Sequence, residues 1–191
     1  MIIAFSGKSQ AGKTTAADFL CSNFGFTRLS FARSLKLKLQ ADFEFSDAQV
    51  FDAAKDTVDP RYGVTPREIL IAVANLYRSF DPDFWVKKSL TNLDPSKNYV
   101  IDDLRFQNEA DHIARLGGTL IRLVREGVEA KVASAAADIS ETELDTYPFE
   151  HVIRANTVED GQGCLMCVLT QLGINATMAI DSDIRKDLNV I

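Results

Sequence analysis

Apolar residues along this chain form short continuous runs that alternate with stretches of helical spacing. Residues 1–6 make the first run, which predicts a fully buried strand, and residues 15–21 carry apolar side chains spaced as on a helix. Further predicted strands cover residues 27–30, 98–103, 119–124 and 151–155, and predicted helices cover residues 33–39, 48–54, 66–77, 84–86, 106–116 and 164–172. Strands that alternate with helices favour a parallel sheet covered by helices, so we expect an α/β fold.

Capping residues mark the helix that begins near position 66. Thr65 can cap its first turn, Pro66 suits the position that follows, and Glu68 completes a capping box. Asp81-Pro82-Asp83 repeats this pattern ahead of the next helix. Near the C-terminus, we expect a loop at residues 156–160 before the closing helix.

Residues 7–14 read Gly-Lys-Ser-Gln-Ala-Gly-Lys-Thr, a complete G-x-x-x-x-G-K-[ST] phosphate loop between the strand and the helix that this motif requires. Gly7 and Gly12 let the backbone approach phosphates closely, with N–H groups pointing inward and a helix N-terminus behind them. Lys13 can reach the β- and γ-phosphates, and the Thr14 hydroxyl is placed to ligate Mg²⁺. The motif predicts binding of a nucleoside triphosphate; the alternative is a glycine-rich turn without a ligand.

The composition is that of a globular chain, with 46% hydrophobic and 25% charged residues in 191, and it indicates one domain. No apolar run approaches the roughly 18 residues of a membrane span, and no basic stretch precedes an apolar one at the start. The net charge of −6 argues against stable binding to a nucleic-acid backbone. We therefore expect a cytoplasmic protein with small-molecule partners and no membrane contact.

Three cysteines suit a reducing compartment better than a disulfide framework. Cys164 and Cys167 form a C-x-x-C pattern within the predicted closing helix. We expect buried helical thiols there. The alternative is a redox or zinc site, for which the sequence offers no second Cys or His pair at ligand spacing.

Asp102 and Asp103 end the predicted strand at 98–103. Ligands of open α/β sheets sit at this carboxyl edge. A carboxylate there can hold Mg²⁺ directly or through water, or orient an attacking phosphate. One of the two could instead cap the segment after Leu104, and the sequence leaves open which of them serves the metal.

Several arginines lie at helix starts and strand ends. Guanidinium groups bind phosphate bidentately and keep their charge. Phosphoryl transfer depends mainly on positioning and on neutralising spread negative charge, so arginines from different elements fit that reaction. On base rates, any one of them is more often a solvated surface charge. They are Arg67, Arg78, Arg105, Arg122 and Arg125.

Three segments together carry a family resemblance. Residues 65–70 (TPREIL), 78–86 (RSFDPDFWV) and 103–110 (DLRFQNEA) resemble the phage-type deoxynucleoside monophosphate kinases. Shorter matches at 29–32, 35–36, 117–118, 125, 140–141 and 144–145 extend the resemblance over roughly residues 1–160. The chain departs from the family at Leu70-Ile71, where a Leu-Gln pair is common; if that Gln reads the base, this chain selects its base differently.

The resemblance implies a P-loop kinase fold with a central parallel sheet of about five strands flanked by helices. It implies one domain over residues 1–191, with a helical monophosphate-binding region at about residues 31–95 and a short lid at about residues 125–141. The implied activity is transfer of the γ-phosphoryl group of ATP, with Mg²⁺, to a deoxynucleoside monophosphate, in the host cytoplasm if the chain is of phage origin. The implied ATP-binding residues are Gly7, Lys8, Ser9, Gln10, Ala11, Gly12, Lys13, Thr14 and Thr15, with Asn156 and Thr157 beside the adenine.

The resemblance also implies which groups act on the substrates. Lys13 would stabilise the transferring group, and Arg67 and Arg105 would clamp the acceptor's phosphate. Asp103 would orient the acceptor or share the magnesium shell with Thr14, and Arg125 would close from the lid. Further implied acceptor-binding residues are Phe31, Ala32, Lys36, Arg78, Trp85, Phe106 and Glu109. For the three aromatic residues among them, packing in the core is the alternative.

Other functions remain open at this point. A P-loop kinase of another small acceptor, such as dephospho-coenzyme A, would share the phosphate loop, and so would an ATPase switch that binds a protein. The chain contains no Asn-Lys-x-Asp motif, which disfavours a GTPase. Its acidic balance disfavours a kinase of nucleic-acid 5′ ends. The sequence does not decide whether the chain forms a homodimer.

Overall fold

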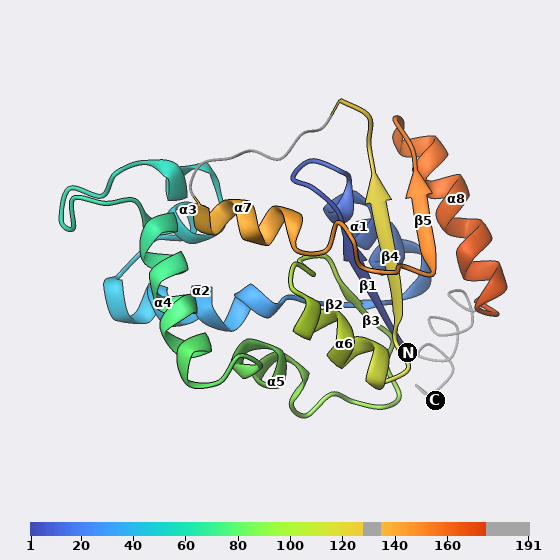
Figure 1. Ribbon diagram of the computed structural model, residues 1–191, viewed down its shortest axis with the longest axis horizontal. Helices are drawn as coiled ribbons and strands as arrows, with labels where there is room; N and C mark the ends of the chain where they lie inside the picture. Colours follow the sequence, from blue (N-terminus) through green and yellow to red (C-terminus); the bar gives the residue numbers. More distant parts are fainter. Residues whose placement is uncertain (128–134, 175–191) are drawn as a thin grey trace, which may run out of the picture. The chain divides into compact units, whose positions relative to one another are not determined.

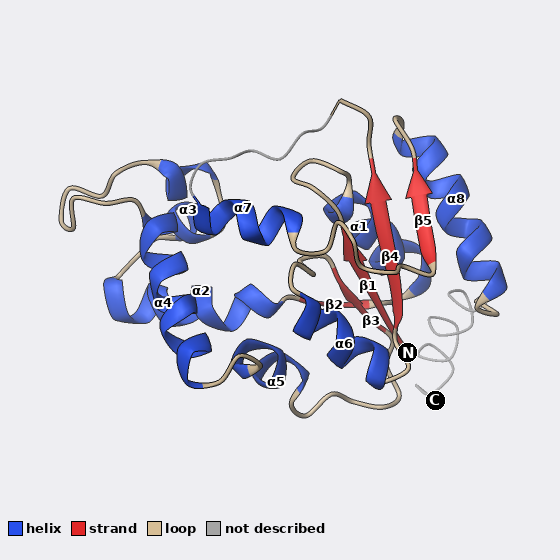
Figure 2. Cartoon of the chain, viewed as in Figure 1, coloured by secondary structure: helices blue, strands red, loops and turns tan. Residues whose placement is uncertain are grey.

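The computed structural model describes residues 1–127 and 135–174. The chain divides into two compact units, one formed by Met1–Leu29 with Asp94–Ile191 and the other by Ser30–Leu93. Figure 1 follows the chain through both units, and Figure 2 shows that the strands all belong to the first. The expected lid at 125–141 falls partly on residues 128–134, which lie outside the described residues.

The first unit is built on a five-stranded sheet in the order β2-β3-β1-β4-β5, and every neighbouring pair is parallel. The strands are β1 (Ile2–Ser6), β2 (Thr27–Leu29), β3 (Tyr99–Ile101), β4 (Thr119–Val124) and β5 (His151–Arg154). This confirms the predicted α/β fold with a parallel sheet. The strands β2 and β3 lie on one side of β1, and β4 and β5 lie on the other. Open α/β sheets bind ligands at such a switch point, beyond the carboxyl end of the strands.

Helices cover both faces of this sheet (Figure 1). The buried apolar side chains of β1 meet Leu20 of one helix and Leu165 of another in the main core cluster. A third helix packs beside β4 through the fully buried Ile113. The helices of this unit are α1 (Lys13–Phe24), α6 (Gln107–Arg115), α7 (Ala135–Thr142) and α8 (Val158–Gln171).

The second unit is helical and has a core of its own. It consists of α2 (Phe31–Phe43), α3 (Asp47–Val50), the 3₁₀ helix η1 (Ala53–Asp56), α4 (Pro66–Phe80) and α5 (Phe84–Leu90). Leu35, Leu39 and Trp85 are buried together at its centre. The predicted capping box at the start of α4 is present: Thr65 N donates to Glu68 Oε2 at 2.7 Å, and Glu68 N donates to Thr65 Oγ1 at 3.2 Å. The helix predicted at 48–54 is instead two short helices.

The loop predicted at residues 156–160 is confirmed at 156 and 157 and is wrong at 158–160, because α8 already begins at Val158. Thr157 caps this helix by accepting the Asp160 N–H at 3.1 Å, and acidic side chains in the first turn favour a helix N-terminus. Gly161 and Gly163 lower the helix propensity here by about 1 kcal/mol each, which the cap and the packing of α8 outweigh.

The prediction of buried thiols in the closing helix is also wrong. Cys164 and Cys167 lie in α8, but both are exposed. Leu165 and Leu169 take the buried positions of the same helix. Sequence spacing placed these cysteines in a helix and could not decide which side of that helix faces the sheet.

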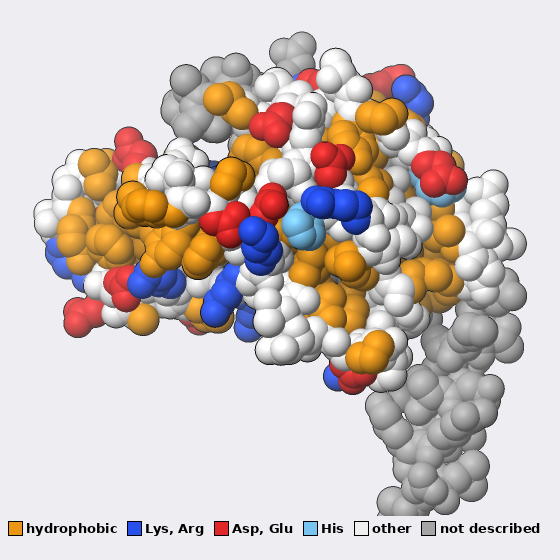
Figure 3. Space-filling model, turned by 60° about the horizontal axis from the view of Figure 1, so that its bottom comes forward, with side chains coloured by type: hydrophobic (Ala, Val, Ile, Leu, Met, Phe, Trp, Pro, Cys, Tyr) orange, Lys and Arg blue, Asp and Glu red, His pale blue; other side chains and the backbone are white. Residues whose placement is uncertain are grey.

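The described surface mixes charges of both signs. On the face drawn in Figure 3, acidic and basic side chains are interspersed among apolar ones. None of the helices within residues 1–127 and 135–174 is long and apolar enough to cross a membrane.

Candidate functional site

The phosphate loop joins the end of β1 to the start of α1, at the switch point of the sheet. Gly7 has φ +153°, and a Cβ at this position would lie 2.5 Å from the carbonyl oxygen of Leu123 in β4. Gly12 has φ +92° and precedes α1 without a side-chain cap. The loop therefore packs closely on the sheet and leaves the first N–H groups of α1 without a capping side chain, which is the arrangement of an anion site.

Lys13 is 8% exposed and folds back onto this loop. Its Nζ donates to the carbonyl oxygen of Gly7 at 2.5 Å and to that of Lys8 at 2.7 Å. Burial, together with the charge of the nearby Arg105 guanidinium, lowers the pKa of Lys13 to about 8, against the opposing effect of Glu141. An anion brought to Lys13 would favour its charged form, so phosphate and protonated lysine stabilise each other.

Arg105 and Arg122 lie beside the loop and bind carboxylates. The Nη1 of Arg105 donates to Glu141 Oε1, and Glu141 Oε2 accepts the Ser9 N–H at 2.8 Å. Arg122 donates to the Ser6 hydroxyl at 2.9 Å and to Asp145.

Asp145 also accepts from the phosphate loop, because Lys8 Nζ lies 2.8 Å from its Oδ2. Two acidic residues four positions apart, Glu141 and Asp145, thus hold cationic groups that surround the loop. Both lie more than 130 positions from the loop residues that they contact. Although the segments that contain them belong to the family resemblance, nothing in their spacing predicts this contact.

Thr14 and Asp102 lie together beside the phosphate loop, and their oxygens could hold a metal ion. Thr14 Oγ1 donates to Asp102 Oδ2 at 3.2 Å. Burial raises the pKa of the Asp102 carboxyl, and the charge of Arg28 opposes that rise. Arg28, which sequence reasoning missed, donates to the Thr14 carbonyl at 2.9 Å and pairs with Asp18 at 2.9 Å. Its signal is a basic residue inside β2, next to β3, the strand that Asp102 directly follows.

Glu109, predicted to bind the acceptor, holds backbone groups in the structure. It is 3% exposed, and its Oε2 accepts the N–H groups of Arg105 at 2.8 Å and Phe106 at 3.1 Å. This fixes the backbone that carries the Arg105 side chain. Phe106 stands at the N-cap of α6 and is partly buried. The acceptor contacts predicted for Glu109, Phe106 and Asp103 stay predictions.

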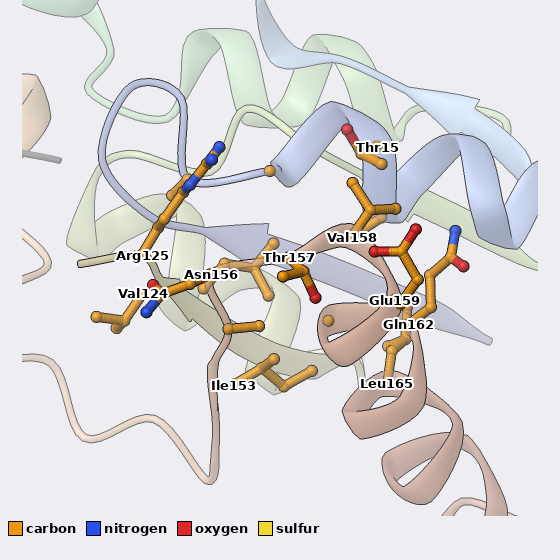
Figure 4. Close-up of a pocket in the computed structure, with 16 residues that line it drawn as sticks. Thr15, Val124, Arg125, Ile153, Asn156, Thr157, Val158, Glu159, Gln162 and Leu165 are labelled. Carbon is orange, nitrogen blue, oxygen red and sulfur yellow. The ribbon is translucent and has the colours of Figure 1, made fainter. Parts of the chain in front are cut away.

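A cavity of about 320 Å³ opens beside the phosphate loop, between the ends of β4 and β5 and the start of α8 (Figure 4). Its walls are largely apolar, and Arg125 stands on one side with Glu159 and Gln162 on the other. A smaller cavity of about 230 Å³ covers Lys13 and Thr14. Gly12, Thr15 and Arg125 line both cavities, so the two adjoin. An apolar cavity next to a phosphate-binding loop suits a nucleotide, with the flat base in the cavity and the phosphates on the loop.

Asn156 and Thr157, predicted to lie beside the adenine, line the larger cavity. Asn156 joins the ends of β4 and β5: its Oδ1 accepts the Glu126 N–H at 3.0 Å, and its Nδ2 donates to Glu126 Oε2 at 3.0 Å. Its side chain therefore shapes the wall of the cavity. The Thr157 hydroxyl caps α8 and donates to Asp160 Oδ2 at 2.8 Å.

The remaining predicted residues belong to the second unit. Arg67 pairs with Asp56, with Nη2 3.1 Å from Oδ2. Lys36 Nζ stands 5.0 Å from the centre of the Phe51 ring. Ala32 and Arg78 lie on α2 and α4. Their acceptor-binding roles stay predictions.

Two of the aromatic candidates are buried. Phe31 is 3% exposed and Trp85 is 4% exposed. The Trp85 indole N–H donates to the Ala74 carbonyl at 3.2 Å, and its ring packs against Tyr77 and Phe84. This placement favours the alternative of core packing for Trp85.

Comparisons with known proteins identify relatives in two viruses. A protein of Acanthamoeba polyphaga mimivirus named "Putative deoxynucleotide monophosphate kinase" is 34% identical over 181 residues, which cover 84% of this chain and 91% of that protein. The uncharacterized protein ORF76 of Ictalurid herpesvirus 1 (strain Auburn) is 28% identical over 165 residues, which cover 83% of this chain and 63% of that protein. No family model matches the chain.

Solved structures resemble the chain more distantly. TT1252 from Thermus thermophilus has a TM-score of 0.48 at 18% identity, over 90% of this chain and 97% of that one. Shikimate kinase from Bacteroides thetaiotaomicron has a TM-score of 0.42 at 13% identity, over 91% of this chain and 99% of that one. The fold of this chain is defined by its own strand order and phosphate loop.

Proposed function

The chain belongs to the deoxynucleotide monophosphate kinase family, and from that membership we propose that it transfers the γ-phosphoryl group of ATP to a deoxynucleoside 5′-monophosphate. The observation that carries the proposal is the phosphate loop with Lys13 folded onto it and Arg105 close enough to lower the pKa of that lysine. Transfer of a phosphoryl group requires cationic side chains close to the backbone N–H groups that bind the phosphates.

The proposed reaction is a direct in-line transfer without a covalent enzyme intermediate. An oxygen of the acceptor's phosphate forms a bond to the γ-phosphorus while the bond from that phosphorus to the β,γ-bridging oxygen breaks. ADP leaves with the bridging oxygen, and the acceptor becomes a diphosphate. Lys13 and the loop N–H groups hold the β- and γ-phosphates, and Arg105 holds the acceptor's phosphate.

The adenine of ATP is assigned to the cavity at the ends of β4 and β5. Its volume of about 320 Å³ and its apolar walls suit a purine. Arg125 reaches both this cavity and the one over Lys13, which supports a role for its charge beside the phosphates. Asn156 and Thr157 form the wall.

Thr14 and Asp102 are the residues that would hold Mg²⁺. A hydroxyl and a carboxylate 3.2 Å apart offer the oxygen ligands that Mg²⁺ prefers. Among the described residues, no group of three or more His, Cys, Asp and Glu side chains could hold a metal ion. When bound, Mg²⁺ neutralises phosphate charge. The position of Asp102 supports assigning it, in place of Asp103, to the metal.

Arg67 and Arg78 are assigned to the acceptor on the family resemblance alone. If Arg67 clamps the acceptor's phosphate, Arg67→Ala raises the KM for the acceptor and lowers kcat, with the KM for ATP little changed. A change confined to the KM for ATP would contradict the clamp.

The test of the proposed function measures ATP consumption with and without acceptors. The four deoxynucleoside monophosphates, their ribonucleotide counterparts and dephospho-coenzyme A are each added to the protein with ATP and Mg²⁺. We expect consumption to be slow with ATP alone and fast with at least one deoxynucleoside monophosphate. Consumption that is equal with and without every acceptor would identify an ATPase, and a response to dephospho-coenzyme A alone would identify a different kinase.

A further inference from the structure

The Glu141 carboxylate occupies groups of the phosphate loop that bind anions. Its Oε2 accepts the Ser9 N–H at 2.8 Å, and its Oε1 accepts from Arg105. The side chain is only 8% exposed, although glutamate is ordinarily a surface residue. The loop backbone and Arg105, which is assigned to the acceptor's phosphate, therefore bind the same carboxylate.

This carboxylate is an anion under ordinary conditions. Burial would raise the pKa of Glu141, but the hydrogen bonds from Arg105 and from the Ser9 N–H, with the charges of Arg105 and Lys13, outweigh burial and hold that pKa below its usual range. Glu141 in turn opposes the fall in the pKa of Lys13. A negative charge thus stands among the cationic groups that are assigned to the transferring phosphoryl group.

We propose that Glu141 is an internal substitute for a phosphoryl group: it fills the anion-binding groups of the phosphate loop while no nucleotide is bound, and the triphosphate displaces it. The proposal rests on the proposed function for the identity of the triphosphate. Beyond that function, the proposal states that a carboxylate of the chain itself competes with the triphosphate for the loop. When Glu141 leaves, Arg105 becomes available to bind the acceptor's phosphate.

The neighbouring contacts make the displacement of Glu141 a local event. Asp145 binds Lys8 and Arg122, and Glu143 Oε1 accepts the Gln107 N–H at 2.9 Å. These contacts hold the residues that follow Glu141 in place, and they involve neither the Ser9 N–H nor Arg105. Glu143→Gln is therefore a matched control, because it neutralises a carboxylate two positions away whose hydrogen bond goes to the Gln107 N–H at the start of α6.

The test compares the binding of ATP and of inorganic tripolyphosphate to the wild type, Glu141→Gln and Glu143→Gln by titration calorimetry without acceptor. A charge-assisted hydrogen bond that must be broken before binding weakens it by at least about tenfold. Glu141→Gln is expected to bind both ligands at least about tenfold more tightly than the wild type, and Glu143→Gln is expected to bind them as the wild type does. Glu141→Asp, whose shorter side chain keeps the charge but reaches less far, is expected to change in the same direction.

Unchanged or weaker binding of both ligands by Glu141→Gln would overturn the proposal, because the carboxylate would then not compete with phosphate. Circular dichroism of each variant shows whether the fold is kept, and Glu141→Asp supplies the test if Glu141→Gln does not fold. The outcome is separate from the proposed function. If Glu141→Gln binds tripolyphosphate more tightly but the wild type transfers phosphate to no acceptor, the role of Glu141 stands and the kinase function is refuted. If the wild type transfers phosphate and Glu141→Gln binds both ligands with unchanged affinity, the kinase function stands and the role of Glu141 is refuted.

Discussion

Gly7→Ala tests whether the phosphate loop depends on its close approach to the sheet. Gly7 adopts φ +153°, and an added Cβ would lie 2.5 Å from the Leu123 carbonyl oxygen and 3.2 Å from the Ala11 Cβ. Leu123 belongs to β4, whose pairing with β1 is in register up to Ser6 and Arg122. The carbonyl therefore cannot move away without disturbing the sheet, and the loop must move instead.

The expected loss of stability has two parts. A non-glycine residue at such a positive φ costs about 1–3 kcal/mol. Forcing a methyl group against a fixed neighbour typically costs about another 1–3 kcal/mol. Partial relaxation of the loop relieves some of this strain, so we expect Gly7→Ala to lower the free energy of unfolding by roughly 2–4 kcal/mol. A displaced loop also misdirects its N–H groups, and ATP binding is expected to weaken by at least about tenfold.

Urea unfolding followed by circular dichroism measures the stability, and calorimetry measures ATP binding. Gly163→Ala is the control, because Gly163 lies within α8 and, apart from its chain neighbours and the backbone of its own helix, no described atom lies within 4 Å of an added Cβ. That change is expected to stabilise the protein by about 0.5–1 kcal/mol, the ordinary gain of alanine over glycine in a helix. The reasoning is refuted if Gly7→Ala unfolds at the wild-type urea concentration and binds ATP with wild-type affinity.

Three further predictions concern the loop lysine, the cavity wall and the second core. Because burial holds the pKa of Lys13 at about 8 and phosphate favours its charged form, ATP affinity measured by calorimetry should fall as pH rises from 8 to 9.5, and Lys13→Met should lose this slope. Asn156→Ala removes both bonds to Glu126 and should raise the KM for ATP by about three- to tenfold in steady-state kinetics, whereas an unchanged KM would show that the wall does not need them. Trp85→Phe should lower the free energy of unfolding by about 1–3 kcal/mol while the KM for the acceptor stays constant, and a large rise in that KM would instead support acceptor binding by Trp85.

Sequence reasoning reached the sheet and the phosphate loop because both depend on local patterns. The buried run before Gly7, the glycine spacing and the capping box at Thr65 are each complete within a few residues. The structure contains these elements close to the predicted bounds. The start of α8 was missed because two glycines obscured the cap at Thr157, and tertiary packing decides such cases.

The contacts around the loop could not be derived from local patterns. Glu141 meets the Ser9 N–H across 132 positions, and Arg28 reaches Thr14 from a neighbouring strand. Such pairings depend on how loops of different lengths return to one edge of the sheet. For the same reason, the sequence could not decide which of Asp102 and Asp103 contacts Thr14, because both end the predicted strand. The structure places Asp102 against Thr14.

The central claim is tested most directly by following the labelled γ-phosphoryl group of ATP. The wild type, Lys13→Ala and the control Lys97→Ala, an exposed lysine ahead of β3, are each incubated with Mg²⁺ and the four deoxynucleoside monophosphates, and the products are separated. The account predicts label in a deoxynucleoside diphosphate with the wild type and with Lys97→Ala, and none with a folded Lys13→Ala. Label that appears as inorganic phosphate alone, or transfer that persists at the wild-type rate in Lys13→Ala, would contradict it.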